Sequence, residues 1–401
     1  MIRVTRRAVA IAAASASAGA ACVLAAGCAS SLPRLPESRI AEPAPEAVES
    51  VLFLLGDAGY ADEMRNPLLL RLLDDIEMWS GRLARDSAVG VLFLGDIVYP
   101  LGLHSSDSPE FARDSAIVQS QVNLLAGPNA MRYNSLGYFL AGNHDWGEAR
   151  NVDGVLRLRN LEEFLDRRRA EGIDVRLQPE AGEPGPAVID FGIQARLVLF
   201  DTAWWLLAQS EYRKRRALQQ TEDAIRSTEG RYIVVAAHHP FESASSHGGL
   251  IPFWKSLGVR FLMTRSGALL QDLSSPAYRE LRDIMLEAFR AGPPLYFAGG
   301  HDHNLQIIDH QTDGFPWPAF TLVSGSGSKV SDLGHIEGML YRGEVPGYMR
   351  VVTHLSGHVD VFVIAAPTEE LLSCPGEGAD LERCMIEGSS HFISRYSKRL
   401  R

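Results

Sequence analysis

Five short apolar segments of this sequence end in the same way, with a small residue followed at once by polar side chains. Each segment is rich in β-branched and aromatic residues, as is typical of buried strands. The carboxyl ends of neighbouring strands in an α/β sheet meet at one edge, so we expect the five polar clusters to share one crevice. In chain order these clusters span residues 56–60, 95–99, 142–145, 237–240 and 300–303.

Apolar runs of this kind alternate with longer segments of helical periodicity, which predicts an α/β protein. Two predicted helices, over 68–79 and 277–291, each follow a polar capping residue and a proline. The last two predicted strands form a hairpin around Ser356 and Gly357. The predicted strands are 51–55, 89–94, 136–141, 196–200, 232–236, 295–298, 320–323, 348–354 and 359–364.

The polar clusters offer carboxylates, a phenol, an amide and imidazoles, but no thiol. This set suits iron, manganese or zinc rather than a structural cysteine–zinc site. It is large enough for two ions, and a carboxylate that bridges ions ~3.5–4 Å apart suits an in-line displacement at phosphorus. Any one of these motifs alone is more often an ordinary loop, so the ordered set of five carries the prediction of a metal site.

The amino terminus has the pattern of an export signal. Arg3, Arg6 and Arg7 precede an Ala-rich run over 8–26, and residues 24–28 resemble a lipoprotein cleavage box that ends in Cys28. We therefore predict a signal over 1–28, lipid on Cys28 and a flexible linker rich in Pro, Ala and Glu over 29–49. The protein is expected in the periplasm or cell envelope, touching a membrane only through this anchor; plain secretion is the alternative.

Cysteine usage fits an exported protein. If Cys22 leaves with the signal and Cys28 carries lipid, only Cys374 and Cys384 remain in the folded part. In an oxidising compartment they are predicted to pair and close a Gly-rich loop in the tail over 367–401. Two free thiols are the alternative.

With these clusters in this order, the sequence resembles the calcineurin-like metallophosphoesterases, and among them the purple acid phosphatases of the small, tartrate-resistant type. The resemblance covers roughly residues 50–330. Its most specific parts are the clusters at 95–99 and 141–145 and the run 300–306, with similar stretches at 200–202 and 324–327. It implies a four-layer αββα sandwich with two central mixed sheets, in a metallophosphoesterase domain over 50–366.

The resemblance also implies the metal ligands. Most metallophosphoesterases have a histidine two residues after the first aspartate, where this chain has Gly59, and the purple acid phosphatases replace it by a tyrosine, here Tyr99. Two ions are implied, an Fe(III) and a divalent Fe, Zn or Mn ion. The implied ligands are Asp57, Tyr99 and His303 for the first ion, Asn143, His238 and His301 for the second, and Asp96 as the bridge.

Two more histidines match family positions that touch the substrate phosphate. They are His144 and His247, and Asp145 is expected to orient the His144 ring. His239 falls on a non-ligand position, and His104, His335 and His358 are expected to be ordinary surface residues. Extra segments over 103–131 and 156–172 are expected to shape the substrate pocket.

The expected function is that of an acid phosphatase, in which metal-bound hydroxide hydrolyses a small phosphate monoester. A phosphodiesterase or nucleotidase on the same site is the nearest alternative, and a non-catalytic surface-binding lipoprotein is the alternative from another class. Removing residues 1–27 takes away three arginines and no acid, so the formal net charge moves from −10 to −13. That charge argues against nucleic acid as the main partner. The oligomeric state stays open.

Overall fold

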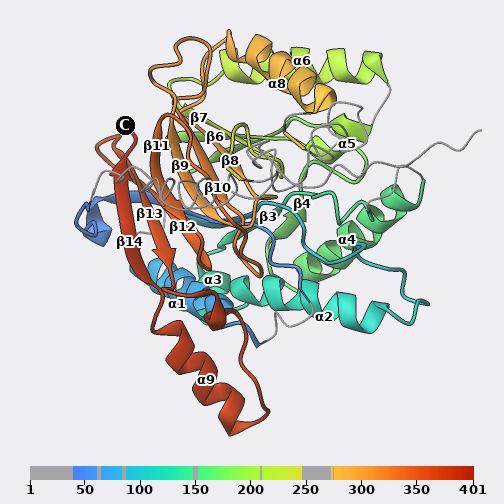
Figure 1. The fold of residues 1–401 in the computed structure, drawn as a ribbon, viewed down its shortest axis with the longest axis vertical. Coiled ribbons are helices and arrows are strands. Elements are labelled where there is room, and N and C mark those ends of the chain that lie inside the picture. The colour runs from blue at the N-terminus through green and yellow to red at the C-terminus, as the bar shows by residue number, and fades with distance from the viewer. Residues whose placement is uncertain are drawn as a thin grey trace, which may run out of the picture. The chain divides into compact units, whose positions relative to one another are not determined.

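The structure is a computed structural model that describes residues 39–60, 65–83, 87–147, 152–207, 210–245, 272–273 and 275–401. All of these residues belong to one compact unit, Pro36–Arg401. Its strands form two seven-stranded sheets, with helices on the outer faces (Figure 1). The predicted αββα sandwich with two central mixed sheets is confirmed.

The first sheet has the strand order β14-β13-β12-β1-β2-β3-β4. Strands β1 to β4 pair in parallel, whereas β12, β13 and β14 extend the sheet in antiparallel fashion on the other side of β1. The strands are β1 (Val48–Leu55), β2 (Ala88–Phe93), β3 (Leu136–Phe139), β4 (Val175–Leu177), β12 (Gly347–His354), β13 (Val359–Ala365) and β14 (Ile393–Arg399).

The second sheet has the order β11-β9-β10-β8-β7-β6-β5. Its four central strands are parallel, and β5, β9 and β11 are antiparallel to their neighbours. The strands are β5 (Ala187–Phe191), β6 (Ala195–Leu199), β7 (Tyr232–Ala236), β8 (Tyr296–Gly299), β9 (Leu305–Asp309), β10 (Phe320–Ser324) and β11 (Met339–Gly343). The central parallel strands of both sheets are the ones that lead into the predicted polar clusters.

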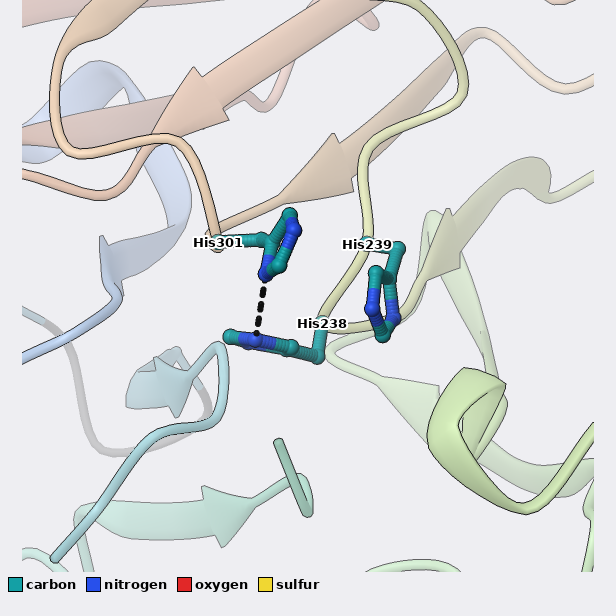
Figure 2. Close-up of side chains that lie close together, drawn as sticks. All are labelled: His238, His239 and His301. Atoms are coloured by element: carbon teal, nitrogen blue, oxygen red, sulfur yellow. Dashed lines mark hydrogen bonds between the residues drawn. The ribbon is translucent and has the colours of Figure 1, made fainter. Parts of the chain in front are cut away.

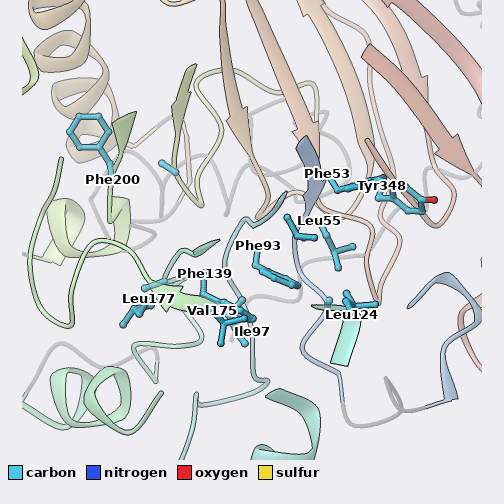
Figure 3. Packing of buried hydrophobic residues seen from close by; sticks show 14 of the residues in the cluster. Phe53, Leu55, Phe93, Ile97, Leu124, Phe139, Val175, Leu177, Phe200 and Tyr348 are labelled. Atoms are coloured by element: carbon cyan, nitrogen blue, oxygen red, sulfur yellow. The ribbon is translucent and has the colours of Figure 1, made fainter. Parts of the chain in front are cut away.

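Strand β1 shows why the sheets are buried on both faces. Leu52 and Leu54 pack among residues drawn from the strands of both sheets, so they fill the space between the sheets. Val51, Phe53 and Leu55 alternate with them and belong to the cluster that includes residues of the helices. Figure 3 shows Phe53 and Leu55 in this cluster. This two-sided burial explains the nearly continuous apolar runs of the central strands.

The helices begin where the sequence predicts them. The Asn66 side chain accepts a hydrogen bond from the backbone N–H of Leu68, and that of Ser275 from the N–H of Tyr278. In Figure 1, α1 to α4 lie beside the first sheet, and α5, α6 and α8 beside the second. The helices are α1 (Pro67–Arg82), α2 (Phe111–Val122), α3 (Pro128–Arg132), α4 (Val152–Ala170), α5 (Thr202–Leu207), α6 (Glu211–Arg226), α8 (Pro276–Phe289) and α9 (Ala379–Ser389). Within the described ranges, none of them has both the length and the apolar character needed to span a membrane.

Both ends of the described chain join the first sheet. Strand β1 starts at Val48, inside the segment predicted to be a linker, and the Ile40 N–H donates to the hydroxyl of Ser397 in β14. The predicted tail contributes α9 and the edge strand β14, so it completes the sheet. The predicted disulfide between Cys374 and Cys384 is confirmed.

Candidate metal centre

The polar clusters that follow β1, β2 and β3 of the first sheet meet those that follow β7 and β8 of the second. Backbone hydrogen bonds tie the two edges together: the Gly56 N–H donates to the Ser324 carbonyl at 2.8 Å. The His301 N–H donates to Oδ2 of Asp57, also at 2.8 Å. The structure therefore brings these clusters together, and the side chains in mutual contact are Asp57, Asp96, Tyr99, Asn143, His238, His301 and His303.

A first group of donor atoms surrounds the hydroxyl of Tyr99. This oxygen lies 3.1 Å from Oδ1 of Asp57, 2.9 Å from Oδ2 of Asp96 and 3.1 Å from Nε2 of His303. Asp57 is fully buried, whereas the His303 side chain keeps 19% of its surface exposed. Solvent therefore does not reach this group at Asp57 but does reach the side chain of His303.

A second group of donor atoms surrounds the side-chain oxygen of Asn143. This Oδ1 atom lies 2.9 Å from Nε2 of His238 and 3.1 Å from Nδ1 of His301. The two nitrogen atoms are 3.2 Å apart, as the dashed line in Figure 2 marks. All three side chains are buried.

Asp96 lies between the two groups. Its Oδ2 atom faces the Tyr99 hydroxyl at 2.9 Å, and its Oδ1 atom lies 3.4 Å from Nε2 of His238. One carboxylate therefore presents one oxygen to each group. This is the geometry of a carboxylate that can bridge two ions.

The tautomer of His238 follows from its outer partner. Its Nδ1 atom lies 2.8 Å from the carbonyl oxygen of Leu94, which can only accept a hydrogen bond. Nδ1 therefore carries a hydrogen, so Nε2 is the ring nitrogen that faces Asn143 and His301 and that can bind a metal ion once it has lost its own hydrogen. A backbone carbonyl that orients a histidine in this way is a common feature of metal sites.

The backbone is strained at three of these positions. Asp57, Asp96 and His301 have φ values of 59°, 53° and 63°, in the left-handed region that side chains rarely adopt. Such conformations cluster at functional sites, where they turn a side chain into position.

The backbone of Gly142 lies directly against the Asp96 side chain. A Cβ atom at position 142 would come within 2.2 Å of Oδ1 of Asp96, so only glycine fits there.

Burial and neighbouring charge act differently on the ionisable groups. Burial raises the pKa of Asp57, and burial together with the charges of Asp96 and Asp57 raises the pKa of Tyr99 well above its ordinary value. Burial also opposes ionisation of Asp96, but the nearby charges of His238 and His144 outweigh it and lower its pKa. Tyr99 therefore stays a phenol by itself and needs a strong cation to ionise it.

His144 lies at the rim of the first group. Its ring centroid is 4.4 Å from that of Tyr99, and its side chain is 21% exposed. Its Nδ1 atom lies 2.7 Å from the carbonyl oxygen of Pro100, so Nδ1 carries a hydrogen. Nε2, 4.0 Å from Oδ2 of Asp96, is then the ring nitrogen that faces the site.

The expectation that Asp145 orients the His144 ring is wrong. The Asp145 carboxylate is buried and accepts hydrogen bonds from the backbone N–H groups of Ile97, Val98 and Gly142. It therefore holds the loop after β2 against the loop after β3, although burial raises its pKa to about 7. The Pro100 carbonyl orients the His144 ring instead.

The remaining predicted histidines differ in their surroundings. His247 lies outside the described residues. The Nδ1 atom of His239 is 2.9 Å from the Thr202 hydroxyl, and its ring lies beside His238 and His301 in Figure 2. A potential ligand atom of His239 lies within 4.8 Å of those of both neighbours. His104 is not an ordinary surface residue, because its half-buried ring pairs at 2.6 Å with the buried Asp114.

Two residues beside the first group were not predicted from the sequence. The ammonium of Lys329 lies 4.1 Å from the centroid of the Tyr99 ring and 4.2 Å from that of Tyr60. Lys329 follows the Gly-rich run 324–327 by two positions, and Tyr60 ends the first polar cluster. Both residues lie close in sequence to loops predicted to form the site, and this closeness could have identified them.

Comparisons with known proteins agree with this architecture. No family model matches the sequence. The chain is 23% identical to purple acid phosphatase 4 of Arabidopsis thaliana over 259 residues, which are 64% of this chain and 63% of that protein. It is 23% identical to purple acid phosphatase 17 of the same plant over 245 residues, 60% of this chain and 59% of that one. The chain thus spans less than two thirds of the length of both.

Solved structures decide the fold. The purple acid phosphatase PPD1 from seeds of yellow lupin, Lupinus luteus, superposes with a TM-score of 0.52 and 14% identity, covering 89% of this chain and 54% of that chain. PhoD superposes with a TM-score of 0.54 and 12% identity, and the superposition covers 91% of this chain and 71% of the PhoD chain. The chain has the metallophosphoesterase fold. In this metallophosphoesterase fold, the two donor groups lie where the central strands of both sheets end.

Proposed function

We propose that this protein is a metal-dependent phosphoesterase, and more specifically an acid phosphatase that hydrolyses phosphate monoesters. The observation that carries the proposal is the position of Asp96, whose two carboxylate oxygens each face one group of donor atoms. The sequence similarity to two purple acid phosphatases supports it.

The donor atoms fit two metal ions. Two ligands that each lie about 2.0–2.2 Å from one ion are about 3 Å apart. Neighbouring donors here are separated by 2.9–3.5 Å in the first group and by 2.9–3.4 Å in the second. The spacing and the donor types thus match two coordination spheres that share Asp96.

The two spheres differ in charge. The first would combine Asp57, Asp96 and Tyr99 with His303 as its one nitrogen donor, which favours a trivalent ion such as Fe(III). The second would combine the neutral donors Asn143, His238 and His301 with Asp96, which suits a divalent Fe, Zn or Mn ion. When bound, the ions would lower the pKa of water and offset the charge that develops at phosphorus.

The protein itself supplies a proton near the leaving group. The Pro100 carbonyl holds the hydrogen on Nδ1 of His144, so the proton that the imidazolium form would give to the leaving alkoxide is the one on Nε2. By the family resemblance, His247 would assist His144. Asp145 acts through the backbone, because it fixes the loops that carry Asp96 and Asn143.

Two other functions are compatible with the same fold. A phosphodiesterase or nucleotidase would use the same donors and would differ only in the room left for the leaving group. A non-catalytic surface-binding lipoprotein is less favoured, because all seven ligand positions of the resemblance hold a side chain able to bind metal.

We also propose that the protein is exported and anchored through lipid on Cys28, so that its substrate is a small phosphate ester outside the cytoplasm. Residues 1–38, which include the predicted signal and about half of the predicted linker, lie outside the described residues. Cys28→Ser should abolish lipid modification and membrane partitioning. Unchanged partitioning of that variant would remove the anchor and leave export untouched.

The function is tested by steady-state kinetics on a phosphate monoester and the matching diester. p-Nitrophenyl phosphate and bis(p-nitrophenyl) phosphate share one leaving group, so their kcat/KM ratio isolates the preference. We expect turnover of both to need metal and the monoester to be preferred. A higher kcat/KM for the diester would favour a phosphodiesterase, and no turnover by fully metallated protein would overturn the proposal.

A further inference from the structure

Lys329 and Tyr60 form a rim beside the first donor group. The Lys329 ammonium is 4.1 Å from the Tyr99 ring centroid and 4.2 Å from the Tyr60 centroid. The two tyrosine rings are 5.4 Å apart, and Tyr60 is 42% exposed. A cation and an exposed aromatic ring thus lie next to a proposed metal ligand.

The position of Lys329 is fixed by the loop that carries it. The Gly327 N–H donates to the Gly56 carbonyl at 3.1 Å, and the Ser328 hydroxyl donates to the Asp57 carbonyl. A Cβ atom on Gly327 would come within 2.6 Å of that Gly56 carbonyl, so the two loops are in close contact. The lysine backbone is therefore held against the loop that supplies Asp57.

Within the described part of the chain, no acid neutralises the charge of Lys329. Among the described residues, no carboxylate oxygen forms an ion pair with its ammonium. Its contacts are with the faces of two aromatic rings, which stabilise a cation without removing its charge. In a chain of net charge −10, this leaves a cation at the rim of the site that can meet an anion.

We infer that Lys329, with Tyr60, forms a subsite for a second anionic group on the substrate. The substrate class is a phosphate ester or anhydride whose leaving group itself carries a phosphate, as in inorganic pyrophosphate. This inference rests on the proposed phosphoesterase function. The ammonium would hydrogen-bond the leaving phosphate, and the exposed Tyr60 ring would cover the adjoining part of the leaving group.

The reaction itself is unchanged in kind. The oxygen of one water bonds to one phosphorus of pyrophosphate, the bridging P–O bond breaks, and two inorganic phosphates leave. The leaving phosphate would take the Nε2 proton of the imidazolium form of His144, and the proton that the attacking water loses balances the one transferred. Lys329 contributes by binding the leaving group, so its effect should depend on the charge of that group.

The experiment compares inorganic pyrophosphate with phenyl phosphate, whose leaving group lacks a second phosphate. Both are assayed with the full-length metallated protein and with Lys329→Met, Lys329→Arg and Lys329→Gln. Lys398→Met on the edge strand β14 serves as the control, because it also removes one positive charge from the chain. Thermal unfolding shows which variants are folded, and Lys329→Gln replaces Lys329→Met if the latter is not.

We expect Lys329→Met to lower the ratio of kcat/KM for pyrophosphate to that for phenyl phosphate about tenfold or more, mainly through KM. Lys329→Arg should keep most of the ratio, and Lys398→Met should leave it unchanged. An unchanged ratio in the folded neutral variants would overturn the subsite, and so would an equal loss on both substrates. Wild-type protein that hydrolyses neither substrate would instead overturn the phosphoesterase function itself.

Discussion

The hydroxyl of Tyr99 lies 2.9 Å from one carboxylate oxygen of Asp96, the residue whose other oxygen faces His238. Tyr99 and Asp96 are three positions apart in the same loop after β2, so one short segment contributes to both donor groups. The positive φ of Asp96 turns its side chain into this position. The loop after β2 is therefore the centre of the proposed site.

Tyr99 is predicted to give the iron-loaded protein its colour. A phenolate bound to Fe(III) produces a ligand-to-metal charge-transfer band in the visible spectrum. Tyr99→Phe should abolish or strongly shift that band, because the variant keeps the ring but lacks the oxygen donor. Tyr212→Phe, on the exposed face of α6, should leave the band unchanged. Protein purified with iron that is colourless, filled with divalent ions and fully active would contradict the iron assignment.

His144 is predicted to serve proton transfer rather than metal binding. His144→Ala should lower kcat on a monoester about 10²–10⁴-fold, the usual contribution of a general acid. The variant should keep the same number of ions per chain, measured by elemental analysis. His358→Ala removes an exposed histidine in the β12–β13 turn and should change neither quantity. Loss of ions from His144→Ala would place this residue among the metal ligands.

Much of the fold could be predicted from the sequence, because the central strands carry long apolar runs. The predicted strand over 232–236 coincides with β7, and both capped helices begin as expected. Edge strand β14 was missed because its sequence, ISRYSKR, is mostly polar and lies half in solvent. A run of apolar residues such as β7 predicts a strand clearly, whereas a short strand with polar residues in it, such as β14 or the buried β9 (LQIID), does not.

Most side chains of the candidate site could also be predicted from the sequence. Polar clusters at strand ends identified its side chains, and the resemblance divided them between two ions. The role of Asp145 could not be predicted, because its partners are backbone N–H groups. The Pro100 carbonyl that orients His144 and the contact between Lys329 and Tyr60 also depend on how loops meet in three dimensions.

Gly142 is predicted to be required for metal binding. In Gly142→Ala, the new Cβ atom would lie 2.2 Å from Oδ1 of Asp96, so the proposed bridging carboxylate must move. We expect this variant to lose ions and most of its turnover. Gly292→Ala is the matched control, because its nearest contact is a flexible Ile225 methyl group at 3.0 Å. Equal metal content and turnover in the two variants would show that the close contact between Gly142 and Asp96 is not needed for metal binding or turnover.

The disulfide between Cys374 and Cys384 is predicted to stabilise the fold at the start of α9. It closes a short loop, for which the loss of chain entropy in the unfolded state is worth about 2–3 kcal/mol. Cys384→Ser should lower the free energy of unfolding in urea by that amount, and chemical reduction of the wild type should have the same effect. Two alkylatable thiols from this pair in the unreduced, denatured protein would show that the bridge is absent in solution.

Asp96→Asn tests the two-ion site most directly, because it keeps the size of the side chain and removes the charge that would hold both ions together. Elemental analysis and turnover of p-nitrophenyl phosphate are measured on the same samples of wild type and variant. We expect two ions per wild-type chain, and in the variant we expect fewer ions together with turnover at the level of buffer alone. A variant that keeps two ions and full turnover would contradict the bridging role of Asp96, and a wild type that is active without metal would contradict the metal-dependent mechanism.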